Sequence, residues 1–138
     1  MATYNKFNDF NNQLSRGTHQ LHAAGHTVKA MLTNTAPVAT NSVKTDLTEI
    51  AAGNGYTAGG FDVQNDISTN GATASLTGVD IAVTASGGAI AQFRYVSLYN
   101  DTAASDNLIC WYDHGSSVDL SAGQTFNINF GATIVDIS

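Results

Sequence analysis

The sequence predicts one mainly β domain, an antiparallel β-sandwich or jelly-roll-like fold with a short N-terminal helix and a second short helix. Several short segments alternate apolar and polar side chains and are separated by turn residues, which is typical of sandwiches. The length of 138 residues suits a single domain over 1–138. No strands alternate with long helical patterns, so a parallel βαβ sheet is not expected.

The first helix is predicted over residues 4–16. Phe7, Phe10 and Leu14 recur at i, i+3 and i+7, which is the spacing of one face of an α-helix. Thr3 is the expected N-cap and Gly17 the expected stop. Residues 1–25 are therefore expected to form a helix and a connector, which could serve as an interaction arm.

Strands are expected through most of the remaining sequence. Residues 26–33 should place Val28, Ala30 and Leu32 on one face, because successive side chains of a strand point to opposite faces. The segment 90–99 is apolar on both faces, so it should lie at the centre of a sheet. The other expected strands are 61–67, 73–84, 107–113, 118–120, 125–130 and 134–137.

The second short helix is predicted to begin at Asn41 or Ser42, either of which could cap it. Val43, Leu47 and Ile50 then follow at helical spacing, and the helix should end at Ile50.

The charge balance excludes several classes of partner. Five Lys and Arg residues stand against eleven Asp and Glu, which gives a net charge of −6. Nucleic-acid binding relies on clustered cations, and so does attraction to an anionic membrane surface, so neither partner is expected. No apolar run is long enough to span a bilayer. The N-terminus lacks the apolar stretch of a signal peptide, so synthesis in a cytoplasm without conventional export is expected.

Three histidines, His19, His22 and His26, lie close together in the sequence. Three imidazoles can hold a catalytic zinc ion, but the surrounding glycines make this stretch a poor helix, and no Glu follows as a general base. An exposed or interfacial connector between helix and strand is the favoured interpretation. The metal alternative stays open.

Other polar or reactive residues suggest a metal site or a catalytic site, but each also has an ordinary structural explanation. Asp101 and Asp106 lie in a loop over 100–107 whose oxygen ligands could suit calcium, although such residues are also ordinary in tight loops. The segment 113–117 holds the residue types of a serine hydrolase, but triad members normally come from separate loops. Cys110 lies within an apolar strand, where a thiol behaves as a small hydrophobe. The sequence therefore predicts neither an enzyme nor a cofactor.

A last group of segments is spread across nearly the whole chain: residues 1–7, 21–29, 32–39, 46–56, 84–88, 93–95, 99–102, 108–109 and 119–126. Together these segments resemble a family of small structural proteins from tailed bacteriophages and prophages. Two departures occur: Gln124 replaces a more usual acidic residue, and Cys110 with Trp111 replaces a Gly-Trp pair.

This resemblance implies a virion component, and a capsid decoration (cement) protein is the favoured version. Its expected partner is the major capsid protein, with lattice neighbours or further copies of itself, and its expected location is the capsid surface. No catalytic residues are carried over. On this hypothesis Phe7, Phe10 and Leu14 anchor the capsid contact; alternatively they only cover the domain's own sheet.

A tail or neck component, including a small receptor-binding fibre tip, is the alternative. A β-sandwich would serve that role equally well. In a fibre tip, the aromatic side chains of Tyr56, Trp111 and Tyr112 could stack on sugar rings.

Overall fold

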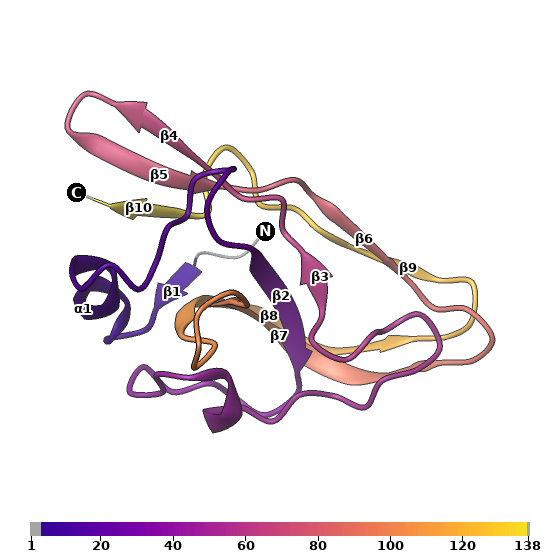
Figure 1. The fold of residues 1–138 in the computed structure, drawn as a ribbon. Helices are drawn as coiled ribbons and strands as arrows, with labels where there is room; N and C mark the ends of the chain where they lie inside the picture. The colour runs from indigo at the N-terminus through magenta and orange to yellow at the C-terminus, as the bar shows by residue number, and fades with distance from the viewer. Residues whose placement is uncertain (1–3, 138) are drawn as a thin grey trace.

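A computed structural model describes residues 4–137, so the expected N-cap Thr3 lies outside the described residues. The fold is mainly β, with antiparallel sheets in a sandwich-like arrangement, as predicted. Figure 1 shows the two layers, with the single α-helix beside the first strand. The elements are β1 (Tyr4–Lys6), α1 (Phe10–Ser15), β2 (Val28–Thr33), the 3-10 turn η1 (Lys44–Asp46), β3 (Phe61–Asp62), β4 (Asp66–Asn70), β5 (Thr73–Thr77), β6 (Ile81–Thr84), β7 (Ile90–Asn100), β8 (Leu108–Leu120), β9 (Thr125–Ile128) and β10 (Val135–Ile137).

The larger layer is a five-stranded antiparallel sheet in the order β1-β8-β7-β2-β3. Strand β7 lies between β8 and β2, which confirms the central position expected from its two apolar faces. Its partner β8 continues to Leu120, so the separate strand expected over 118–120 is the end of the same element. Along β8 the register with β7 shifts between Phe93 and Tyr95, where Phe93 faces Val118 and Tyr95 faces Asp113.

The second layer is an antiparallel ribbon with an interruption at its middle. Strands β4, β5 and β10 form one part, and β6 pairs with β9 in the other. The single strand expected over 73–84 is therefore two strands, separated at Gly78. A Cβ on Gly78 would come within 2.5 Å of Val63 and 2.8 Å of Ile134. The two strands are therefore separated at a residue where the side chains of Val63 and Ile134 leave no room for a Cβ. The strand expected over 61–67 is likewise divided, because β3 joins the larger sheet and β4 the smaller one.

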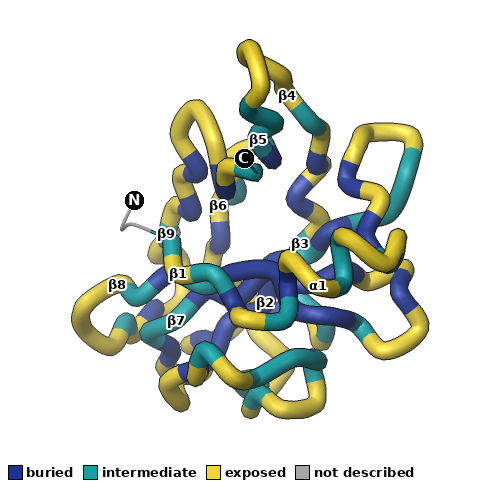
Figure 2. The backbone as a smooth tube through the Cα atoms, turned by 90° about the vertical axis from the view of Figure 1, so that its left-hand side faces the viewer, coloured by how far each residue is buried: buried dark blue, intermediate teal, exposed yellow. Residues whose placement is uncertain are grey.

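The main core fills the space between the layers. Val28, Ala30 and Leu32 face it together, as their alternation predicts, and they are fully buried. Phe93 also belongs to this core, because the register shift in β7 turns it away from the face that carries Tyr99. Figure 2 shows the buried segments in the central strands and the exposed ones in the loops and hairpin tips.

A second, smaller cluster covers the outer face of the five-stranded sheet. It consists of Phe7, Met31, Tyr99 and Leu108, with partly buried Leu47 and Trp111 against them. Leu47 places the segment between β2 and β3, here called the covering segment, on this face. The larger sheet is therefore covered on both sides.

The predicted N-terminal helix over 4–16 is wrong at its start. Residues 4–6 form the edge strand β1, in which Tyr4 pairs with Tyr112 of β8, and the helix runs only from Phe10 to Ser15. Asp9 precedes the helix and accepts hydrogen bonds from the side chains of Asn12 and Gln13. An open edge on β8 offers backbone hydrogen bonds that outweigh the weak helical preference of this asparagine-rich segment.

The second predicted helix is also wrong. Only the turn Lys44–Asp46 is helical, and the chain is extended on both sides of it. Val43 forms an isolated bridge with Asn107, and Thr33 forms another with Glu49, so the segment is tied to neighbouring strands. These tertiary pairings replace the local helical hydrogen bonds that the spacing of Val43, Leu47 and Ile50 suggested.

Candidate functional site

The three residues expected to anchor a partner do not share a face. Phe7 precedes the helix and packs against Trp111 in the outer cluster, with ring centroids 4.6 Å apart. Phe10 lies in the main core, and both phenylalanine side chains are essentially inaccessible. Leu14 is partly buried at the margin of that core. In this conformation the two rings therefore contact the chain's own sheets, and Leu14 alone retains exposed surface.

One carboxylate links the segment between β2 and β3 internally, across seven and ten residues. Glu49 Oε2 accepts hydrogen bonds from the Tyr56 hydroxyl at 2.5 Å and from the Gly59 backbone N–H at 2.7 Å. The Tyr56 hydroxyl in turn accepts one from the buried Leu32 N–H at 3.1 Å. Burial and the neighbouring Glu49 raise the pKa of Tyr56 well above its usual value, so this hydroxyl stays protonated.

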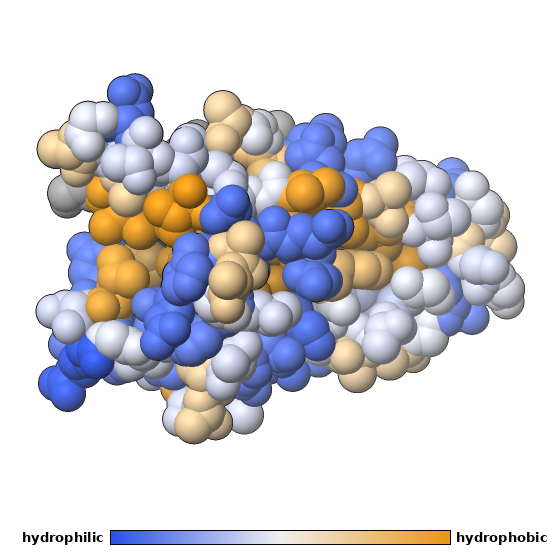
Figure 3. All heavy atoms as spheres, turned by 45° about the horizontal axis from the view of Figure 1, so that its top comes forward, coloured by the Kyte–Doolittle hydropathy of each residue, from blue (hydrophilic) through white to orange (hydrophobic). Residues whose placement is uncertain are grey.

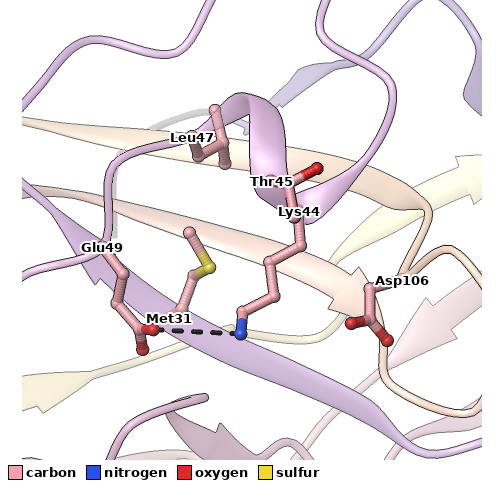
Figure 4. A pocket seen from close by; sticks show the side chains of 6 residues that line it. All are labelled: Met31, Lys44, Thr45, Leu47, Glu49 and Asp106. Carbon is pink, nitrogen blue, oxygen red and sulfur yellow. Dashed lines mark ion pairs between the residues drawn. The ribbon is translucent and has the colours of Figure 1, made fainter.

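A pocket opens beside this network, with a cavity volume of about 350 Å³. Figure 4 shows Lys44 extending toward the gap between Glu49 and Asp106. Lys44 Nζ lies 3.8 Å from Glu49 Oε1 and 5.3 Å from the centre of the Tyr99 ring. The lining residues are Met31, Lys44, Thr45, Leu47, Glu49 and Asp106.

The pocket lining carries one cation and two carboxylates. Its only cation, Lys44, is loosely paired with Glu49, and the two carboxylates leave the lining with a small negative balance. Sequence reasoning missed this pocket, although Glu49 is the only glutamate in the chain.

The histidine-containing connector forms a buried polar cluster with Asn100. His19 is buried, and the Asn100 amide nitrogen lies 3.0 Å from its Nδ1 and 2.9 Å from His26 Nδ1. His22 is exposed and takes no part in these contacts. Among residues 4–137, no group of three or more His, Cys, Asp or Glu side chains is placed to hold a metal ion.

The other polar clusters are occupied by local contacts. Asp101 forms an ion pair with Lys29 at 3.3 Å. Asp113 accepts two hydrogen bonds from the Arg94 guanidinium and one from the Gly115 N–H, and these partners hold the pKa of its carboxyl below the usual value. His114 packs edge-on against Phe126 instead of approaching a serine. The residue types of a hydrolase are adjacent here in sequence but are not arranged as a triad.

The aromatic and thiol candidates lie inside the fold. Tyr56 and Tyr112 are almost completely buried, and Trp111 is partly covered by Phe7. These three rings therefore do not form an exposed platform for sugars. Cys110 is fully buried, and burial raises the pKa of its thiol, which leaves it in the unreactive protonated form.

Several segments that carry the family resemblance meet in space. Asn54 accepts a hydrogen bond from the Ser86 N–H through its backbone carbonyl and donates one to the Ala89 carbonyl through its side chain. The Asp101 N–H donates to the carbonyl of Thr27, which joins the segments 99–102 and 21–29. In these two places, segments that carry the resemblance are therefore joined by hydrogen bonds between loops.

On the face that Figure 3 shows, the apolar areas are divided. None of the helices in the described part of the chain is long and apolar enough to cross a bilayer. Figure 3 shows apolar atoms in patches that hydrophilic side chains interrupt. Comparison with protein-family models, with curated proteins and with solved structures finds no match to this chain.

Proposed function

We propose that this chain is a structural protein of a tailed-phage virion, and that it decorates the capsid by binding the lattice of major capsid protein. The observation that carries the proposal is the resemblance spread along the chain, from residues 1–7 to residues 119–126. In the structure these segments include loops, such as the one that Asn54 joins to Ser86 and Ala89, and also parts of strands β1, β2, β7 and β8. A family recognised by such residues is defined by its fold and its surfaces.

Two physical properties support a decorating role. The covered sandwich buries its apolar side chains within one chain, so a free subunit needs no partner to hide them. The sequence has only 12% charged residues, and its abundant Thr, Ser and Asn give short polar side chains that lose little rotamer entropy when they pack against neighbours. We further propose that the chain has no enzymatic activity and that it acts on the capsid surface.

The number of copies per virion tests the proposal directly. Quantitative mass spectrometry of purified virions would give the ratio of this chain to the major capsid protein. A fixed ratio close to that of the lattice subunits is the expected result, because symmetric shells bind decoration at equivalent sites. Only a few copies per particle would instead indicate a neck, tail or fibre-tip component, and absence from the virion would overturn the assignment.

Binding to undecorated shells separates lattice contact from incidental copurification. Purified chain should bind such shells saturably and raise the temperature at which they disrupt. Leu14 is the one proposed anchor with exposed surface, so Leu14→Asn can report on its contact without removing a fully buried ring. Val79→Asn, at an exposed valine in the other layer, is the matched control. Equal binding by both variants would remove Leu14 from the contact.

A further inference from the structure

Asn100 has an amide orientation that its surroundings fix. Its Oδ1 accepts hydrogen bonds from the backbone N–H groups of Thr102 at 3.1 Å and Ala103 at 3.2 Å. The side chain is fully buried at the end of β7. Exchanging the amide oxygen and nitrogen would place an NH₂ group against two N–H donors. The Asn100 Nδ2 atom therefore points toward the connector.

This orientation determines the protonation of two histidines. Nδ2 can only donate, and its two hydrogens face Nδ1 of His19 and Nδ1 of His26, with the Thr18 carbonyl farther away at 3.4 Å. Both Nδ1 atoms must act as acceptors, so each neutral imidazole carries its proton on Nε2. His19 Nε2 is buried and has no hydrogen-bond partner among the described groups.

We propose that Asn100, His19 and His26, here called the Asn100 cluster, form an acid-sensitive attachment that holds the connector 17–27 against the loop between β7 and β8. Protonating either imidazole puts a hydrogen on Nδ1, directly opposite an amide hydrogen of Asn100. A hydrogen bond is thereby replaced by contact between two donors. The inference does not depend on the proposed function.

The charged groups around the cluster do not compensate for that loss. Burial, followed by the proximity of His26, lowers the pKa of His19 to about 4, while Asp9 opposes this shift in part. Lys29 and Asp101, beside the cluster, already neutralise each other. His22 and Asp66 are exposed, and Asp66 accepts a hydrogen bond from the Ala23 N–H.

The sign of the pH effect follows from this lowered pKa. The folded state prefers neutral His19, whereas the detached or unfolded connector titrates near the ordinary value of 6.5. Attachment is therefore strongest above that pH, and it weakens progressively as the pH falls from 6.5 toward about 4.

A second asparagine keeps the detachment local. Asn65 Nδ2 donates to the carbonyls of Leu21 and His26, and its Oδ1 accepts from the Val28 N–H. None of these groups titrates between neutral and mildly acidic pH. Acid should therefore release the connector from Asn100, while Asn65 still holds it at the Leu21 and His26 carbonyls and Thr27 keeps its hydrogen bonds to Asp101 and Thr102.

Histidine NMR on the intact chain tests the protonation states. Two-dimensional long-range ¹H–¹⁵N spectra at pH 7 should show His19 and His26 as Nε2–H tautomers. An Nδ1–H tautomer or a protonated ring at either His19 or His26 would overturn the proposal.

Amide hydrogen exchange tests the attachment itself. Corrected for intrinsic rates and referenced to the β7 core, protection of residues 17–27 should fall about tenfold or more between pH 7 and pH 4. In the double variant His19→Asn/His26→Asn, amide oxygens can replace the Nδ1 acceptors without titrating, so protection should stay constant. Asn65→Ala is the control, because it should loosen the connector while leaving the pH dependence in place.

One substitution should invert the response. In Asn100→Asp, one carboxylate oxygen keeps the backbone N–H groups and the other accepts from a protonated imidazole, so protection should rise as the pH falls. If this variant does not fold, the histidine double variant decides. Wild-type protection that is independent of pH, or an equal acid response in the double variant, would overturn the proposal.

Discussion

The Tyr56 hydroxyl and the Glu49 carboxylate are joined by a 2.5 Å hydrogen bond within the covering segment. The same hydroxyl accepts from the Leu32 N–H of β2, so one side chain joins a strand to the segment that crosses it. Glu49 extends the network to the Gly59 N–H and to Lys44 at the pocket. The pocket therefore has the shape that this network gives to the covering segment.

Tyr56→Phe should lower the free energy of unfolding by about 1–3 kcal/mol, because it leaves the buried Leu32 N–H without an acceptor. Urea unfolding followed by circular dichroism would measure the change. Tyr95→Phe is the control, since Tyr95 is only partly buried and its hydroxyl makes no hydrogen bond among the described residues. A loss in the control equal to that of Tyr56→Phe would contradict the assigned role.

Gly60→Ala should destabilise the protein much more than Gly123→Ala. Both glycines have positive φ, at +87° and +89°, so both substitutions carry the left-handed strain of about 1–2 kcal/mol. Only at Gly60 would the new Cβ collide with the backbone of Ala30 and Met31, whereas nothing lies within 4 Å at Gly123. The difference between their unfolding midpoints measures how closely the covering segment approaches β2. Similar midpoints would contradict that approach.

Phe10→Ala should cost about 3–5 kcal/mol of stability, because it removes a fully buried ring from the main core. Leu14→Ala should cost less, since Leu14 is only partly buried. Thermal unfolding of the two variants gives the comparison. A near-neutral Phe10→Ala that nevertheless lost shell binding would show that the ring serves a partner instead of the core.

The Cys110 thiol should react with a thiol reagent only as the protein unfolds. Complete burial blocks access and raises the thiol pKa, so little thiolate forms. The labelling rate across a urea series should follow the unfolded fraction. Rapid labelling in native buffer would mean that β8 opens locally, and Trp111 fluorescence would show whether its neighbour moves at the same time.

The sequence predicted best those strands whose own alternation of apolar and polar side chains shows which of their faces are buried. Residues 90–99 are apolar on both faces, and the structure places β7 in the middle of a sheet with both faces covered. The alternation of Val28, Ala30 and Leu32 correctly identified one core face. Such patterns are informative because a strand's side chains divide between two faces whatever the partner strands are.

The helices and the site were harder to predict because distant partners decide them. Phe7 and Phe10 have helical spacing, yet pairing of β1 with β8 puts Phe7 in the outer cluster and Phe10 in the main core. Val43 similarly pairs with Asn107 across the fold instead of starting a helix. Asn100 gave no signal of its cluster, since its contacts reach back to His19 and His26.

The sequence by itself determined the mainly β class, the central strand and one core face, because these depend on alternation and turn residues along a continuous stretch of chain. Only the tertiary structure decided the rest: which edge β1 completes, where the chain breaks at Gly78, and how Asn100 meets two histidines. Each of these depends on a hydrogen bond or a close contact between segments that are far apart in the sequence. Local pattern carries no information about such a partner until the sheets have assembled around it.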